Sequence, residues 1–95
     1  MGIYPVHFMD RNGPRIRANR NEQKALITLL RQVRIEAGLR QVDMAESLKV
    51  PQSYVSKYES GERRLDALEL RAVCRAAQIS LTTFAKRLER RLGHD

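Results

Sequence analysis

The residues with the clearest chemical potential are polar side chains around residues 52–57, in a stretch with helical periodicity. Gln52 and Lys57 point from the same face of the predicted helix, and Ser53 lies beside them. An amide can bond adenine through N6 and N7, a hydroxyl can donate or accept, and an ammonium group can reach guanine O6 and N7 or a phosphate. Tyr54 could stack on sugar and phosphate or pack on a thymine methyl. This set predicts contacts to base edges in a DNA duplex.

A second set of side chains is suited to phosphates. Gln41 begins a predicted helix, where free backbone N–H groups and the helix dipole favour an anion. Arg40 precedes it, and Arg63 and Arg64 lie in a charged loop further on. We expect five residues to contact phosphates: Arg40, Gln41, Ser56, Arg63 and Arg64. Taken singly, each of these residues could equally be a surface side chain without a partner.

Catalytic and metal-binding patterns are missing from the sequence. His7 and His94 stand near opposite ends, without the spacing of zinc ligands. No glycine-rich phosphate loop occurs, and two terminal histidines support no Ser/His/Asp arrangement. We therefore expect a binding protein that is not an enzyme and needs no cofactor or metal.

The charge of the chain favours a polyanionic partner. Lys and Arg number 18 against 11 Asp and Glu, and the net charge is +7 with a pI near 10.3. Nucleic acid or an acidic membrane surface would suit such a balance. No apolar run approaches the ~20 residues of a membrane span, so a cytoplasmic protein is expected. The single Cys74 allows no internal disulfide, and its helical stripe predicts a buried thiol.

The stretch 41–59 organises the rest of the chain. Met44, Ala45 and Leu48 recur at helical spacing, and Val55 and Tyr58 share one face of the next predicted helix. Residues 49–51 form the turn between them, because proline disfavours the α conformation of the residue before it and presets φ for a helix start. The pattern predicts two short helices that meet at a tight turn, which is a helix-turn-helix.

Three further helices complete an all-α, five-helix expectation. Asn21 is the predicted N-cap of the first, Asp66 with Glu69 forms something close to a capping box for the fourth, and Ser80 caps the fifth. We assign residues 22–95 to one domain and 1–21 to a non-helical extension. For the extension a flexible leader, a basic arm lying on DNA and an apolar pad for a partner all stay open.

The stretch from Ile27 to Leu81 resembles the DNA-binding domain of Cro/C1-type (XRE family) regulators. The resemblance is carried by several spaced motifs: Leu30-Arg31, Arg34, Ala37-Gly38-Leu39, Gln41, Leu48, Val50, Gln52-Ser53, Val55-Ser56 and Glu59-Ser60-Gly61. It implies a lambda-repressor-like bundle in which the positions of Gln41, Gln52, Ser53 and Lys57 face DNA. It also implies an ion pair between Arg34 and Glu59. The family usually has glycine where this chain has Lys49 and Gln78.

The resemblance and the residues together predict a transcriptional regulator of double-stranded DNA, most simply a repressor. One domain reads only a few base pairs, so we expect a homodimer on half-sites about 34 Å apart. The apolar stripe of the last helix suggests the dimer contact, at Phe84, Leu88 and Leu92. The rival hypothesis is an antitoxin that neutralises a toxin protein and autoregulates its operon, and another is an adaptor that binds only proteins.

Overall fold

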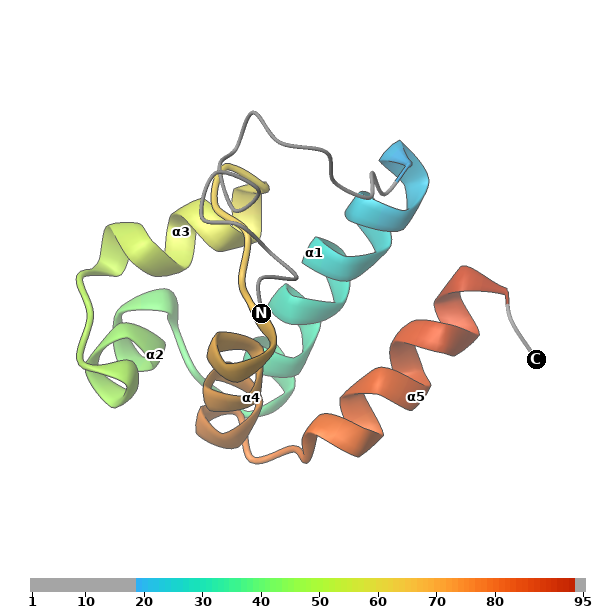
Figure 1. Cartoon of the computed structure of the whole chain (residues 1–95). Coiled ribbons are helices and arrows are strands. Elements are labelled where there is room, and N and C mark those ends of the chain that lie inside the picture. Colours follow the sequence, from blue (N-terminus) through green and yellow to red (C-terminus); the bar gives the residue numbers. More distant parts are fainter. Residues whose placement is uncertain (1–18, 94–95) are drawn as a thin grey trace, which may run out of the picture.

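The computed structural model describes residues 19–93, which form five α-helices and, within that range, no strand (Figure 1). The helices are α1 (Arg20–Glu36), α2 (Gln41–Leu48), α3 (Gln52–Ser60), α4 (Ala67–Ala76) and α5 (Leu81–Leu92). The all-α, five-helix expectation is confirmed. The predicted roles of residues 1–18 lie outside the described residues.

The first helix begins earlier than the sequence suggested. Asn19 is its N-cap: the Asn19 side chain accepts from the Glu22 backbone N–H at 2.8 Å, and Glu22 accepts from the Asn19 backbone N–H at 3.1 Å. The expectation of a cap at Asn21 is therefore wrong. A capping box needs an acidic or amide side chain three residues after the cap, and from Asn21 that position would be Lys24. Arg20 and Asn21 are helical rather than part of an extension.

The predicted caps of the last two helices are confirmed. Asp66 and Glu69 exchange side-chain to backbone hydrogen bonds of 2.7 and 2.9 Å at the start of α4. The Ser80 hydroxyl accepts from the Thr83 backbone N–H at 3.0 Å at the start of α5. These bonds satisfy backbone donors that a helix leaves unpaired at its N-terminus, so both helix starts are fixed locally.

Two helix ends use a left-handed residue that is not glycine. Lys49 has φ of 61° after α2, and Gln78 has φ of 62° after α4. After Lys49 the chain is held by a hydrogen bond from the Val50 N–H to the Ala45 carbonyl, at 3.0 Å. The left-handed conformation crowds Cβ against the following carbonyl in any residue but glycine. The fold therefore tolerates local strain at both helix ends.

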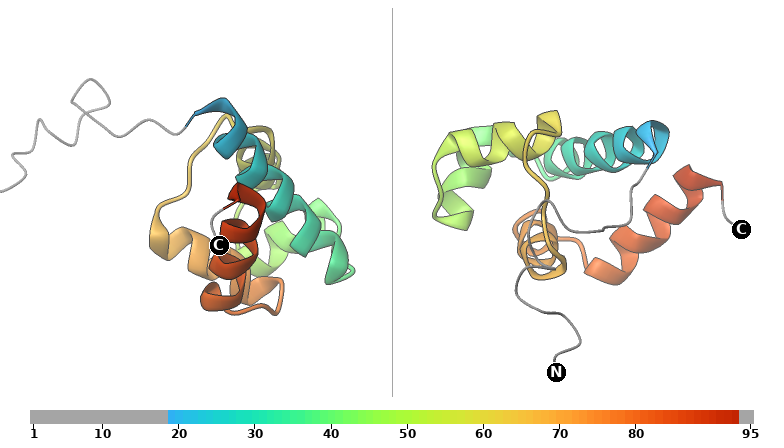
Figure 2. Two further views of the ribbon diagram at one scale, coloured as in Figure 1. Left: turned by 90° about the vertical axis from the view of Figure 1, so that its right-hand side faces the viewer. Right: turned by 45° about the horizontal axis from the view of Figure 1, so that its top comes forward.

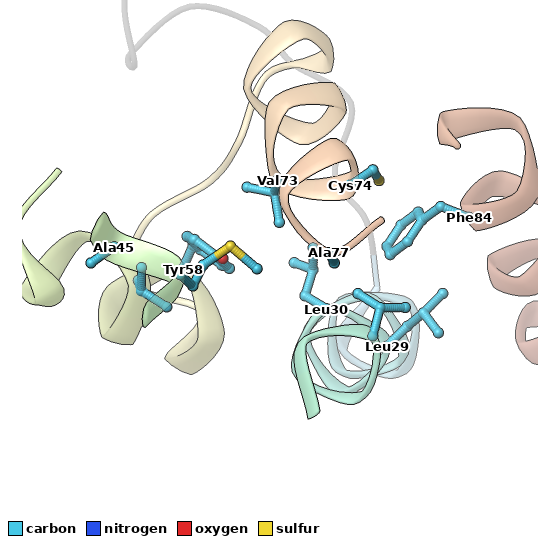
Figure 3. Close-up of a cluster of buried hydrophobic side chains, with 11 residues drawn as sticks. Leu29, Leu30, Ala45, Tyr58, Val73, Cys74, Ala77 and Phe84 are labelled. Carbon is cyan, nitrogen blue, oxygen red and sulfur yellow. The ribbon is translucent and has the colours of Figure 1, made fainter. Parts of the chain in front are cut away.

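One hydrophobic core holds the helices together (Figure 3). The buried apolar side chains come from all five helices and the residue that ends α4: Leu29, Leu30, Val33, Met44, Ala45, Val55, Tyr58, Val73, Cys74, Ala77 and Phe84. Ala45 is 3 % exposed on α2, where it packs in the same core as Val55 and Tyr58 of α3. Because α2 and α3 both contribute to this core, the turn between them is held in one orientation.

The last helix is tied to α1 by polar side chains as well as by the core. Figure 2 shows α5 running beside α1. Arg87 makes two 2.9 Å hydrogen bonds to the carboxylate of Glu36, and Gln32 donates to the same carboxylate at 2.8 Å. Arg91 also donates to Gln32. Within residues 19–93, none of the helices combines the length and apolar character that crossing a bilayer requires.

Candidate nucleic-acid interface

The outer face of α3 carries three of the four side chains predicted to contact bases. Gln52, Ser53 and Lys57 are all exposed, while Val55 and Tyr58 on the opposite face are fully buried. Burial of that face sets the rotation of α3, so the polar side chains must point outward. No side chain caps α3 at Pro51. The first N–H groups of α3 therefore remain available to an anion, in the positive field of the helix N-terminus.

A chain of hydrogen bonds connects this outer face to the interior. Arg34 donates to Glu59 through Nε at 2.7 Å and Nη2 at 3.1 Å. The amide of Gln41 donates to Glu59 Oε1 at 3.1 Å, and the amide of Gln52 lies 3.5 Å from Gln41 Oε1. Four side chains from α1, α2 and α3 are thereby joined. Gln41 and Gln52 lie next to each other at the surface end of the chain.

The inner end of the chain is a buried ion pair. The side chains of Arg34 and Glu59 are 9 % and 4 % exposed, and Arg34 also donates to the Leu39 carbonyl at 2.8 Å. The hydrogen bonds that Arg34 donates to Glu59 raise the pKa of Arg34 above its ordinary value, although burial acts in the opposite direction. Each charge has the other as its partner, which offsets the free-energy cost of burying an unpaired charge. It fastens α3 to α1 and to the α1–α2 loop.

Tyr54 and Arg63 form a second, separate cluster beside α3. The guanidinium carbon of Arg63 lies 4.5 Å from the ring centroid of Tyr54, and Nη2 of Arg63 bonds Glu69 at 2.8 Å. The Tyr54 ring packs edge-on against Tyr58, with centroids 5.9 Å apart. The pKa of the Arg63 guanidinium is raised above its ordinary value, mainly by Tyr54 and in the same direction by Glu69. Arg63 was expected as a phosphate contact, and here its charge is shared with a carboxylate.

The other residues predicted to contact phosphates differ in what they already bind. Arg40 is exposed but makes two 2.9 Å bonds to Asp43, whose pKa is lowered to about 2 by those bonds and by the Arg40 backbone N–H. The Ser56 hydroxyl donates to the Ser53 carbonyl at 3.2 Å. Arg64 is exposed and makes no ion pair within residues 19–93. Its charge is the least compensated of the set.

Sequence reasoning missed the carboxylates that hold these cations. Asp43 follows Arg40 by three residues, a spacing at which helical side chains meet, so this pair could have been found. Glu69 was recognised only as part of a helix cap, and its second oxygen is the one that binds Arg63. Nothing in the spacing of these two residues indicates that contact.

The predicted dimer contact needs one correction. Phe84 is 0 % exposed and packs in the core of its own chain, so its side chain is not available to a partner. Leu88 and Leu92 are half-buried on the same helix, and Leu88 packs against the core. An amphipathic stripe shows which face is apolar, but not whether the surface that covers it belongs to the same chain.

The chain matches a family model and several solved structures. The family model described as helix-turn-helix matches residues 30–84. An XRE-family like protein from Pseudomonas syringae pv. tomato is 39 % identical, with a TM-score of 0.68 over 73 % of this chain and 84 % of that one. No curated protein matches the chain.

Two more distant structures share the fold. The restriction-modification controller protein C.Esp1396I is 22 % identical, with a TM-score of 0.71 over 81 % of this chain and all of its own length. The clp gene regulator ClgR from C. glutamicum is 23 % identical, with a TM-score of 0.68 over 82 % of this chain and all of its own length. The helix-turn-helix seen in the structure is thus shared with known regulators of this architecture.

Proposed function

Because the chain belongs to the Cro/C1-type (XRE) helix-turn-helix family of DNA-binding transcription regulators, we propose that it is a repressor that binds a two-fold operator as a homodimer. The observation that carries this proposal is the exposed polar face of α3, with Gln52, Ser53 and Lys57 outward and Gln41 beside them. An α-helix fits the major groove, where each base pair presents a distinct set of donors and acceptors.

Base contacts are assigned to the outer face of α3. Gln52 and Lys57 meet base edges, Ser53 meets a base through its hydroxyl, and Tyr54 stacks on sugar and phosphate or packs on a thymine methyl. Gln41 supports this arrangement from α2, because its amide oxygen lies 3.5 Å from the Gln52 amide. Such a contact limits the orientations of Gln52 before it meets DNA, which reduces the entropy lost on binding.

Phosphate contacts are assigned to the N-terminal end of α2, to Ser56 of α3 and to the loop after α3. Gln41 lies at the N-terminus of α2, and Arg64 is an exposed cation in the loop. Gln41 acts mainly through the backbone N–H groups at the start of α2, because its side-chain amide already bonds Glu59. Arg40, Ser56 and Arg63 contribute more weakly, because each side chain already bonds a group within the chain. A cation that must leave a carboxylate to reach a phosphate gains less than a free one.

A substitution pair tests the division between base and phosphate contacts. Gln52→Ala should relax preference at one base pair per half-site, at about 1–3 kcal/mol for that base. Arg64→Ala should weaken binding to all sequences alike and reduce the salt slope by about one unit. Binding is measured against single-base operator variants at several salt concentrations. A Gln52→Ala protein that keeps every base preference would show that α3 docks differently.

The dimer is assigned to the surface of α5 around Leu88 and Leu92. A symmetric contact there would place the same face of both copies together. Leu92→Lys is the cleaner test, because Leu92 is half-buried without belonging to the core cluster. The variant should sediment as a folded monomer and bind a single half-site, with Arg90→Gln on the exposed side of α5 as control. A folded Leu92→Lys protein that stays dimeric counts against this surface.

A further inference from the structure

Two adjoining hollows lie between the first half of α1 and the loop that follows α3. The first has a volume of about 210 Å³ and is walled mainly by leucine and isoleucine side chains: Leu26, Ile27 and Leu30 on α1, Leu65 before α4 and Leu70 on α4. The second, about 430 Å³, is more open and reaches the N-terminal turn of α1. Gln23, Ile27 and Arg64 line both, so the two hollows are direct neighbours.

The second hollow is cationic. Arg20, Lys24 and Arg64 line it, and among the described residues no carboxylate lines either hollow. Within residues 19–93, none of these three cations forms an ion pair. Arg63, which lines the apolar hollow, is instead held by Glu69. An apolar chamber therefore lies beside a group of cations that form no ion pair within residues 19–93.

We propose that the two hollows form one binding site for a small amphipathic anion. Its apolar body fills the chamber between Leu26, Leu30 and Leu65, and its carboxylate meets Arg64 with Lys24 or Arg20. A dry cavity of about 150 Å³ already holds a benzene molecule, so the chamber has room for a medium-length alkyl chain. Charge-assisted hydrogen bonds to a guanidinium provide the orientation. An inorganic anion would leave the apolar chamber unused.

The site also touches the proposed DNA interface. Arg64 is the least compensated of the cations assigned to phosphate, and its neighbour Arg63 stacks on Tyr54 of α3. A carboxylate that occupies Arg64 competes with a DNA phosphate for the same guanidinium. Ligand binding should therefore weaken duplex binding. This consequence, unlike the site itself, rests on the proposed function.

The site is tested first without DNA, on the full chain, with octanoate and the uncharged octanol as probes. Octanoate should bind saturably and shift the backbone NMR resonances of Gln23, Ile27 and Leu65. Octanol should bind about tenfold more weakly, because it keeps the apolar body and lacks the charge. Equal affinity for the two probes, or resonance shifts scattered over the whole surface, would overturn the proposal.

Substitutions separate the two parts of the site. Arg64→Gln should lower octanoate affinity about tenfold and leave octanol unchanged, whereas Ile27→Ser should weaken both probes. Arg75→Gln, an exposed cation of α4 outside both hollows, is the control. If Arg64→Gln behaved like Arg75→Gln, the charge assignment would be wrong. Saturable octanoate binding at these residues by a protein that binds no duplex would support the site and refute the proposed function.

Discussion

Removal of the Glu59 carboxylate should destabilise the fold more than any comparable change at the surface. In Glu59→Ala the guanidinium of Arg34, 9 % exposed, loses both of its hydrogen bonds to Glu59 and keeps the one to the Leu39 carbonyl. A buried charge left without its partner typically costs about 3–5 kcal/mol. Gln41 loses its acceptor at the same time, so the start of α2 is loosened as well.

That free energy is large for a chain of this size. At about 0.05–0.15 kcal/mol per residue, a small domain has only about 5–15 kcal/mol of total stability. One kcal/mol shifts the Tm of such a domain by about 4–8 °C. The Glu59→Ala variant should therefore have a Tm at least about 10 °C below that of the parent protein.

Thermal unfolding followed by circular dichroism gives the comparison, with two matched variants. Glu62→Ala removes an exposed carboxylate three residues away and should change stability by no more than about 0.5 kcal/mol. The double variant Arg34→Met/Glu59→Leu removes both charges and should recover much of the loss, because apolar replacement of a buried pair is often neutral. Equal shifts for Glu59→Ala and Glu62→Ala, or a double variant as unstable as Glu59→Ala, would refute the reasoning.

Three further outcomes are expected. Lys49→Gly should raise the free energy of unfolding by about 0.5–1 kcal/mol, because φ at Lys49 is 61° and glycine adopts this conformation without a clash of Cβ. The control Lys86→Gly, within α5, should lower it by about 1 kcal/mol. Chemical denaturation measures both. Tyr58→Phe should raise Tm, because the buried Tyr58 hydroxyl has no hydrogen-bond partner within residues 19–93 and an unpaired buried polar group costs about 1–3 kcal/mol; an unchanged or lower Tm would contradict this. Burial raises the pKa of the Cys74 thiol from 9.0 to about 11, so the folded state holds this proton more tightly than the unfolded state. The contribution of this proton to stability is complete below pH 9 and is lost as the pH rises from 9 to 11. Chemical denaturation at several pH values should detect this loss in the parent protein and not in Cys74→Ala. Iodoacetamide should label Cys74 only after unfolding.

Local signals in the sequence determined most of the fold. The caps at Asp66 and Ser80 are each read from a few neighbouring residues, and both are found in the structure. The start of α1 was misplaced because two asparagines stand close together and the decisive signal was the distance to Glu22. The start of a helix can thus be predicted when both residues of its capping pair are identified in the sequence.

Contacts between elements were harder to foresee. Gln41 and Glu59 are 18 residues apart, and Arg63 reaches Glu69 across a loop. No periodicity encodes such contacts, which depend on how the helices pack. Phe84 illustrates the same limit, because its position on an apolar stripe fitted a dimer surface as well as the core in which it is found. The exposed side chains of α3 could be predicted, because the buried apolar face of a helix determines which side chains point outward.

The hydrogen-bond chain from Arg34 to Gln52 has an implication for how new operator preferences could arise. Its bonds lengthen outward, from 2.7 Å at the buried pair to 3.5 Å at Gln52, and a bond of that last length is weak. A substitution at position 52 thus breaks only the weakest bond, on an exposed side chain. The residues proposed to read the DNA sequence could therefore diverge with little loss of fold stability, whereas a change at Arg34 or Glu59 would lower the stability of the fold whatever the DNA target.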